Sequence, residues 1–196
     1  MIDLKSIEVG DRTQLPYLLK YLGLVGEGIE IGVQTGVYSE YILARSDLKK
    51  LYLCDPWRHL DNGYEPHSNI VDDRWQADLD ATIERLARYQ DRYQIVRKTS
   101  MEAVKDFADE SLDFVYIDAD HRYDYAKEDI ANWWPKVKVG GVFAGHDYYD
   151  SQDLPSSFPY KEYADHYGVK RAVQEFFGSR EFFVTQEEWP SWYLIK

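Results

Sequence analysis

The stretch that decides the fold is Glu30-Ile31-Gly32-Val33-Gln34-Thr35-Gly36, the end of a predicted strand followed by a turn with two glycines. Glycine lets the backbone turn sharply and approach a ligand closely where a strand passes into a helix. The spacing is acid-x-Gly-x-x-x-Gly, without the third glycine of the Gly-x-Gly-x-x-Gly dinucleotide motif. It therefore favours a ligand with an amino-acid tail over one with a pyrophosphate. The alternative is an ordinary strand–turn–helix junction without a ligand.

Short apolar runs alternate with longer amphipathic segments on both sides of this turn. This alternation is typical of βαβ units and predicts an α/β fold with a mostly parallel sheet. We expect strands over 28–31, 51–54, 93–96, 112–117 and 142–145, and a closing antiparallel pair over 182–185 and 192–195. We expect helices over 13–22, 37–45, 71–89, 101–107, 123–134 and 169–177.

Length and composition favour a single domain over residues 1–196. The cysteine content is compatible with a reducing compartment. The chain has 196 residues, 44% of them hydrophobic, which suits one packed core. It has a single cysteine, Cys54, no apolar run long enough to cross a membrane, and no secretory leader in its first residues. We therefore expect a cytoplasmic protein. The formal net charge of −12, without a basic stripe, argues against binding to nucleic acid or anionic membranes.

Four residues after the second and third strands are candidates for binding a nucleoside. Asp55 ends the second strand, where a carboxylate can accept hydrogen bonds from both ribose hydroxyls, although alone it could be a turn residue. Trp57 could cover an adenine face or anchor the loop to the core. Ser100 and Met101 follow the third strand, where this kind of fold borders the adenine. Ser100 is also well placed to cap the next helix.

Two central strands end in ionisable residues. The run Phe114-Val115-Tyr116-Ile117 leads directly into Asp118-Ala119-Asp120-His121, and the fifth strand ends in His146-Asp147. Because parallel strands place their carboxyl ends at one edge, these groups should meet there. Such groups are costly to bury unless they are paired or bind something.

The cluster allows two functional interpretations and a structural one. In the first, Asp118, His146 and Asp147 bind a divalent metal, which holds a hydroxyl group of the substrate and lowers the pKa of that hydroxyl. In the second, no metal binds and His121 or His146 acts as general base. In the structural interpretation, Asp120 and His121 cap the next helix while His146 and Asp147 shape a turn. We favour the metal over the metal-free base.

Taken in order, these motifs resemble the class I S-adenosylmethionine-dependent methyltransferases, most closely the small bacterial group called methyltransferase family 24. The resemblance covers roughly residues 26–178. It rests on the first glycine turn, on Asp55, on the run 113–121, and on the segments 134–142 and 168–173. It implies a Rossmann-like three-layer α/β/α sandwich whose seven-stranded sheet has an antiparallel C-terminal strand. S-adenosylmethionine would be bound by Glu30, Gly32, Gly36, Asp55, Trp57, Ser100, Met101 and Asp118.

The run ending in Asp118 is also similar to that of metal-dependent catechol and caffeoyl-coenzyme A O-methyltransferases. In those enzymes the residue corresponding to Asp118 binds the metal. Oxygen ligands suit Mg²⁺ or Ca²⁺ and an imidazole admits Mn²⁺, Fe²⁺ or Zn²⁺, and we expect Mg²⁺ or Mn²⁺ here. They carry Asp-Asn after the fifth strand, whereas this chain has His146-Asp147, and a shift of one residue would bring Tyr148 into the pair. This departure leaves the metal and its identity open.

The resemblance implies methyl transfer, which we expect to go to an oxygen of a small hydroxylated acceptor such as a sugar, a phenol or a natural-product intermediate. Loops over 56–70 and 148–167 should form the acceptor pocket and lid. A nicotinamide-dependent oxidoreductase and a non-catalytic S-adenosylmethionine-binding module are the alternatives. A homodimer would be compatible with an aromatic lid, but the sequence does not specify one.

Overall fold

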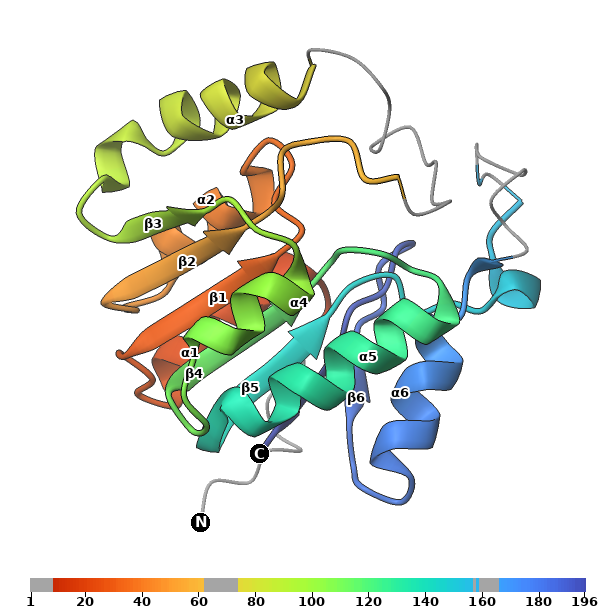
Figure 1. The fold of residues 1–196 in the computed structure, drawn as a ribbon. Coiled ribbons are helices and arrows are strands. Elements are labelled where there is room, and N and C mark those ends of the chain that lie inside the picture. Colours follow the sequence, from red (N-terminus) through yellow and green to blue (C-terminus); the bar gives the residue numbers. More distant parts are fainter. Residues whose placement is uncertain (1–8, 62–73, 157, 159–165) are drawn as a thin grey trace.

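The computed structural model describes residues 9–61, 74–156, 158 and 166–196. Within these residues, one seven-stranded sheet has the order β3-β2-β1-β4-β5-β7-β6 (Figure 1). The strands are β1 Glu27–Ile31, β2 Lys50–Cys54, β3 Tyr93–Val96, β4 Leu112–Ile117, β5 Val137–Gly145, β6 Phe183–Val184 and β7 Trp192–Ile195. The first five are mutually parallel, and β7 runs antiparallel to both β5 and β6. The predicted mostly parallel sheet with an antiparallel closing pair is confirmed.

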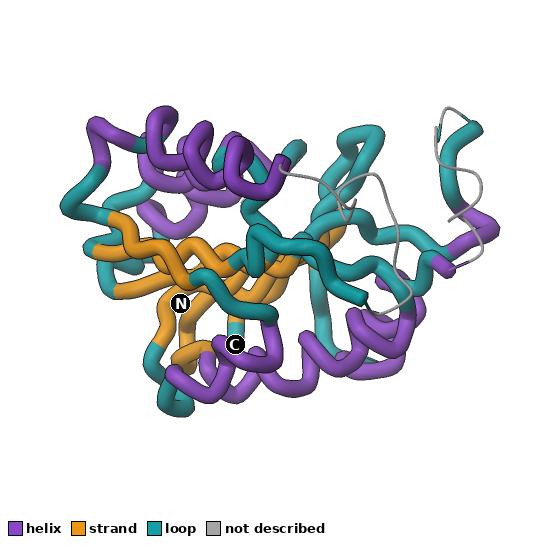
Figure 2. Tube along the Cα trace, turned by 45° about the horizontal axis from the view of Figure 1, so that its top comes forward, coloured by secondary structure: helices purple, strands orange, loops and turns teal. Residues whose placement is uncertain are grey.

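Helices cover both faces of the sheet and give three layers (Figure 2). They are α1 Leu15–Tyr21, α2 Val37–Arg45, α3 Arg74–Arg85, α4 Ser100–Ala103, α5 Tyr123–Trp133 and α6 Val169–Phe177. On one face, α1, α2 and α3 contribute residues such as Leu19, Ile42 and Leu79 to a core that includes Phe114 and Tyr116 of β4. On the other face, residues of α4, α5 and α6 pack against the alternate side chains of the same strands. Among the described helices, none combines the length and the apolar character that a membrane crossing requires.

Strand β4 reads as a continuous apolar run because both of its faces are covered. All six of its residues, Asp113 included, are buried. The fully buried Phe114 and Tyr116 lie in one core, and Val115 and Ile117 lie in the other. This pattern is typical of a central parallel strand and explains why its bounds could be predicted from the sequence.

Strand β5 differs from the prediction because it begins at Val137 and not at 142. Its pairing with β4 shifts register between Leu112 and Phe114, and Gly140 has a φ of +83°. The two glycines therefore form an irregularity inside the strand, where we expected them to precede it. The carboxyl end of β5 is where we predicted it.

The sheet order reverses between β1 and β4, since the chain runs outward through β2 and β3 and then returns to the other side of β1. Crevices at the carboxyl ends of strands flanking such a switch point are the usual ligand sites of open α/β sheets. Here the register places Ile31 beside Ile117, and Ile117 beside Gly145. The residues that follow these strands, Gly32, Asp118 and His146, are thereby brought together.

Candidate active site

A cavity of about 1150 Å³ lies at the carboxyl ends of β1, β2, β4 and β5. Of the predicted site residues, all except Gly36 and Trp57 line it: Glu30, Gly32, Asp55, Ser100, Met101, Asp118, His121, His146 and Asp147. The volume exceeds the range of typical small-molecule pockets and leaves room for a nucleoside together with a second molecule. Parts of the predicted acceptor loops, 62–70 and 157 with 159–165, lie outside the described residues.

At the glycine turn, the backbone that follows β1 lies very close to the backbone that follows β4. Gly32 has a φ of +87°, and a Cβ built on it would lie 1.8 Å from the carbonyl oxygen of Asp118. Gly36 has a φ of +71° and begins α2, where its Cβ would lie 2.9 Å from the side chain of Thr82. Both positions therefore require glycine, the first for close approach at the cavity and the second for entry into the helix.

Glu30 is a buried acid at the base of the cavity. Its carboxylate accepts a hydrogen bond from the hydroxyl of Ser39 on α2. Burial raises its pKa to about 8, although the Ser39 hydrogen bond acts in the opposite direction and the Asp118 charge adds to the rise. A carboxyl group of this kind is largely neutral in the cofactor-free protein at neutral pH.

Asp55 binds the glycine turn through its carboxylate. One oxygen accepts hydrogen bonds from the backbone N–H groups of Val33 and Gln34, both at 3.0 Å, and the other accepts from the N–H of Trp57 at 2.8 Å. Burial raises the pKa of Asp55, and these three hydrogen bonds partly offset the rise. Asp55 lies where a ribose ligand was predicted, and it also holds the turn that would carry the nucleoside.

Trp57 is placed differently from our interpretation of it as an adenine cover. Its side chain is fully buried, and its indole N–H donates to the carbonyl oxygen of Gln34 at 2.9 Å. It is absent from the cavity wall. The alternative interpretation, an anchor that packs the loop on the core, describes its position, and we do not assign it to the cofactor site.

The turn after β3 borders the cavity with Lys98, Thr99, Ser100 and Met101. Thr99 caps α4, in a reciprocal capping box with Glu102, so the alternative role that we considered for Ser100, as the helix cap, is not observed. The hydroxyl of Ser100 donates a hydrogen bond to the carboxylate of Asp129. It also accepts a hydrogen bond from the indole N–H of Trp133 at 2.8 Å. Burial raises the pKa of Asp129 to about 7.

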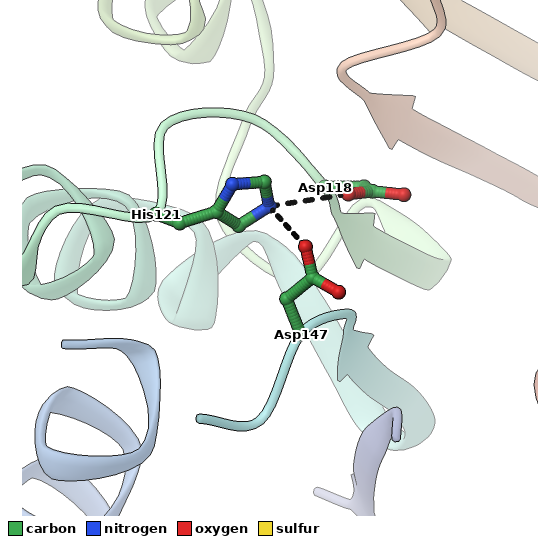
Figure 3. A group of neighbouring side chains, drawn as sticks. All are labelled: Asp118, His121 and Asp147. Carbon is green, nitrogen blue, oxygen red and sulfur yellow. Dashed lines mark hydrogen bonds and ion pairs between the residues drawn. The ribbon is translucent and has the colours of Figure 1, made fainter. Parts of the chain in front are cut away.

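The predicted acid and histidine cluster forms at the ends of β4 and β5 (Figure 3). His121 Nε2 lies 3.0 Å from Asp147 Oδ2 and 3.4 Å from Asp118 Oδ1. His146 Nδ1 lies 3.1 Å from Asp147 Oδ1 and 3.5 Å from Asp118 Oδ2. Asp120, by contrast, pairs with Arg122 at 2.7 Å and accepts from its backbone N–H, so it fixes the turn before α5.

The charges of this cluster stabilise one another. Burial disfavours the charged form of Asp118, yet the neighbouring histidines hold the pKa of its carboxyl well below the usual range. Burial lowers and the nearby carboxylates of Asp147 and Asp118 raise the pKa of His121, which reaches about 9. Burial also lowers the pKa of His146, but the carboxylates of Asp118 and Asp147 together raise it by more, so the net shift is upward. With a pKa of about 9, His121 is largely protonated at neutral pH.

The same residues fit a divalent cation. Among the described residues, ligand atoms of Asp118, His121 and Asp147 lie within 4.8 Å of one another. Oδ1 of Asp147 is buried and accepts no hydrogen bond, even though His146 Nδ1 is close by. This donor set differs from the predicted one in containing His121, whereas His146 flanks the same two carboxylates. A site with two carboxylate oxygens and an imidazole nitrogen suits Mn²⁺, Fe²⁺ or Zn²⁺ better than a site made of oxygens alone does.

Arg12 is a cavity residue that the sequence analysis missed. It lies in a 3₁₀ turn, Arg12–Gln14, before α1, and its Nη1 donates to Asp118 Oδ2 at 3.2 Å. No local motif marks it, because its partner is 106 residues away along the chain.

An aromatic wall closes the side of the cavity beside His121. Tyr167 stacks on the His121 ring at 5.2 Å, and Phe158 packs against Tyr167 and Trp189. Phe158, Tyr167 and Trp189 all line the cavity. They lie within or after the loop that was predicted to form the acceptor pocket.

A family model described as a methyltransferase domain matches residues 29–148, more than half of the chain. This chain belongs to that methyltransferase family. The matched segment runs from β1 to just beyond His146-Asp147 and so includes both the glycine turn and the acid and histidine cluster. Membership agrees with the resemblance of the ordered motifs to class I S-adenosylmethionine-dependent methyltransferases.

Solved structures share the fold of this methyltransferase at low sequence identity. An O-methyltransferase from Bacillus cereus in complex with S-adenosylhomocysteine has a TM-score of 0.63 at 12% identity, over 94% of this chain and 80% of that one. The O-methyltransferase TomG from Streptomyces achromogenes, in complex with S-adenosylmethionine, has a TM-score of 0.59 at 14% identity, over 94% and 79%. The N-methyltransferase NodS from Bradyrhizobium japonicum, with S-adenosylhomocysteine, has 0.61 at 16%, over 93% and 82%. The shared fold therefore does not distinguish oxygen from nitrogen acceptors.

An uncharacterized protein of Sinorhizobium fredii is 33% identical over 85 residues. The match covers 38% of this chain and 9% of that protein. It therefore carries no argument about activity.

Proposed function

We propose that this protein is an S-adenosylmethionine-dependent methyltransferase that methylates an oxygen of a small hydroxylated acceptor. The observation that carries the proposal is the convergence, at one cavity, of the Gly32 turn, the Asp55 carboxylate and the Asp118 cluster. The turn would hold the amino-acid tail, Asp55 the ribose, and Ser100 with Met101 the adenine. The methyl group would then face the ends of β4 and β5.

The reaction needs no covalent enzyme intermediate. The acceptor oxygen attacks the methyl carbon, the bond from sulfur to that carbon breaks, and the sulfonium becomes a neutral thioether. The protein's contribution is to place donor and acceptor in line, which can supply much of the rate enhancement. The rings of Tyr167, Phe158 and Trp189 suit the face of a sugar or a phenol.

The acceptor proton must leave during the reaction, and the cluster offers a route. A protonated histidine is not a base, so His121 or His146 can accept a proton only when the negative charge beside it is offset. A positive charge of the bound cofactor near Asp118 would provide this offset and lower the pKa of both histidines. His121, beside the aromatic wall, is then the better placed base.

A divalent cation would also help to remove the acceptor proton, because it would lower the pKa of the acceptor hydroxyl. Asp118, Asp147 and one or both histidines would hold it. We propose Mn²⁺ as the better match to these donors, with Mg²⁺ as the second candidate. Binding would displace the protons of the histidines, so metal affinity should rise with pH.

Calorimetric titration with S-adenosylhomocysteine and, separately, with NADH tests the cofactor. We expect S-adenosylhomocysteine to bind with a dissociation constant in the micromolar range, a binding free energy on the order of −8 kcal/mol, and NADH not to bind. Binding of NADH alone would contradict the proposal. A screen of phenols and sugars with methyl-labelled donor then tests catalysis. Cofactor binding without turnover, unaffected by Asp118→Ala, would favour the non-catalytic module.

Titration with Mn²⁺ tests the metal independently of activity. We expect Asp147→Ala to weaken Mn²⁺ binding by about tenfold or more. Asp120→Ala is the matched control, because Asp120 lies in the same cavity wall but pairs with Arg122, and it should leave the affinity unchanged. Equal loss in both variants, or no binding to the wild type, would exclude the metal site.

A further inference from the structure

Arg12 is held rigidly at the cavity by three distant segments. Its backbone N–H donates to the Glu187 carboxylate at 2.8 Å, and its carbonyl oxygen accepts from the Tyr38 hydroxyl at 2.9 Å. The guanidinium lies 5.2 Å from the centroid of the Tyr38 ring. These contacts hold the backbone of Arg12 beside the cavity and place its guanidinium near Tyr38 and Asp118.

The carboxylate of Asp118 is the charged partner of Arg12. Asp118 Oδ2 lies 3.2 Å from Arg12 Nη1, and the buried carboxyl group of Glu30 lines the same cavity. Arg58 and Lys98, the other Arg and Lys side chains in the described cavity wall, follow β2 and β3 and pair with Glu102 and Asp106. Of these three cavity residues, Arg12 is the one that pairs with Asp118.

An amino-acid tail carries a carboxylate and an ammonium group on one carbon. Arg12 and Asp118 place the two complementary charges side by side, 3.2 Å apart. We propose that Arg12 binds the carboxylate of the S-adenosylmethionine tail while Asp118 takes its ammonium group, so that the zwitterion replaces the ion pair between Arg12 and Asp118. The guanidinium fork can hold a carboxylate through two parallel hydrogen bonds, which a lysine cannot reproduce.

This inference rests on the proposed function, and cofactor analogues separate the two. S-adenosylhomocysteine carries the carboxylate and the ammonium group of the tail. Decarboxylated S-adenosylmethionine keeps the ammonium group and the sulfonium of S-adenosylmethionine but lacks its carboxylate, and 5′-methylthioadenosine lacks both charged groups of the tail. Arg12→Met keeps the length of the side chain and removes its charge. We expect Arg12→Met to weaken S-adenosylhomocysteine by about 10- to 100-fold. The affinities of the other two ligands should change by less than about threefold.

Two further variants control for an effect of the Arg12→Met substitution on folding. Arg12→Lys should recover part of the lost affinity, because it restores charge without the fork. Arg45→Met is the matched control: Arg45 donates to the Thr13 carbonyl in the same 3₁₀ turn at 2.8 Å but does not line the cavity. It should leave the ratio of the S-adenosylhomocysteine and 5′-methylthioadenosine affinities unchanged.

The outcomes are distinct. If Arg12→Met weakens S-adenosylhomocysteine and the decarboxylated analogue by the same factor, or weakens neither, the inference is overturned while the proposed function stands. An effect confined to the KM of the acceptor would assign Arg12 to the acceptor and also overturn it. If the wild type binds none of the three nucleosides, the proposed function fails first.

Discussion

The buried carboxyl group of Glu30 should make the stability of this protein fall as pH rises. Its pKa is raised from 4.5 to about 8, with burial as the largest cause. Between these values the unfolded chain has released the proton and the folded chain still holds it. The folded state therefore loses about 1.4 kcal/mol of stability for each pH unit, or about 5 kcal/mol over the whole span, as an upper value.

Glu30→Gln removes this titration and keeps the shape of the side chain and its contact with Ser39. The amide is neutral at every pH, as is the protonated carboxyl that it replaces. We expect the difference in unfolding free energy between variant and wild type to grow by about 3 kcal/mol from about pH 5.5 to about pH 9, in favour of the variant. Above the folded pKa both states of the wild type are ionised, so the difference should level off.

Urea unfolding, followed by tryptophan fluorescence at half-unit pH steps, measures this difference. Glu84→Gln, an exposed position on α3, is the control and should give a difference that does not change with pH. Parallel stability curves for Glu30→Gln and the wild type would refute the reasoning. They would show that water or a cation reaches the carboxylate and keeps it ionised in the folded state.

Two further substitutions test the cofactor side of the cavity. Gly32→Ala places a methyl group 1.8 Å from the Asp118 carbonyl oxygen. It should abolish S-adenosylhomocysteine binding in calorimetry and lower stability by about 3 kcal/mol or more, because φ is also positive there; retained binding would show that this turn does not carry the cofactor. Asp55→Ala leaves three backbone N–H groups without their acceptor. It should cost about 2–4 kcal/mol in urea unfolding and weaken S-adenosylhomocysteine at least about tenfold, and an unchanged affinity would remove Asp55 from the ribose site.

The parts of the fold that could be predicted from the sequence are those fixed by local pattern. The bounds of β4 and α2 follow from an apolar run and from Gly36 at the start of the helix. The gathering of Asp118, His146 and Asp147 follows from strand polarity alone, since parallel strands end at one edge. Neither deduction needs knowledge of distant contacts.

The errors arose where a neighbour decides the role of a residue. Thr99 and Ser100 are both capable caps, and Glu102 favours Thr99 because its reciprocal bond requires a spacing of three. The sequence does contain that signal. The role of Trp57, in contrast, is set by the Gln34 carbonyl across the glycine turn, and nothing near position 57 specifies it.

Arg12 shows most clearly why the site was incomplete in the sequence. Its place depends on Glu187 near one end of the chain, on Tyr38 in α2 and on Asp118 after β4. These contacts join segments whose closeness is a property of the finished sheet. The consequence is functional: Asp118 in the empty site is shared by Arg12, His121 and His146, so any cation that binds it must compete with three partners. A ligand that brings an anion for Arg12 together with a cation for Asp118 avoids the competition with Arg12. For this reason, we expect the cofactor to bind without a metal.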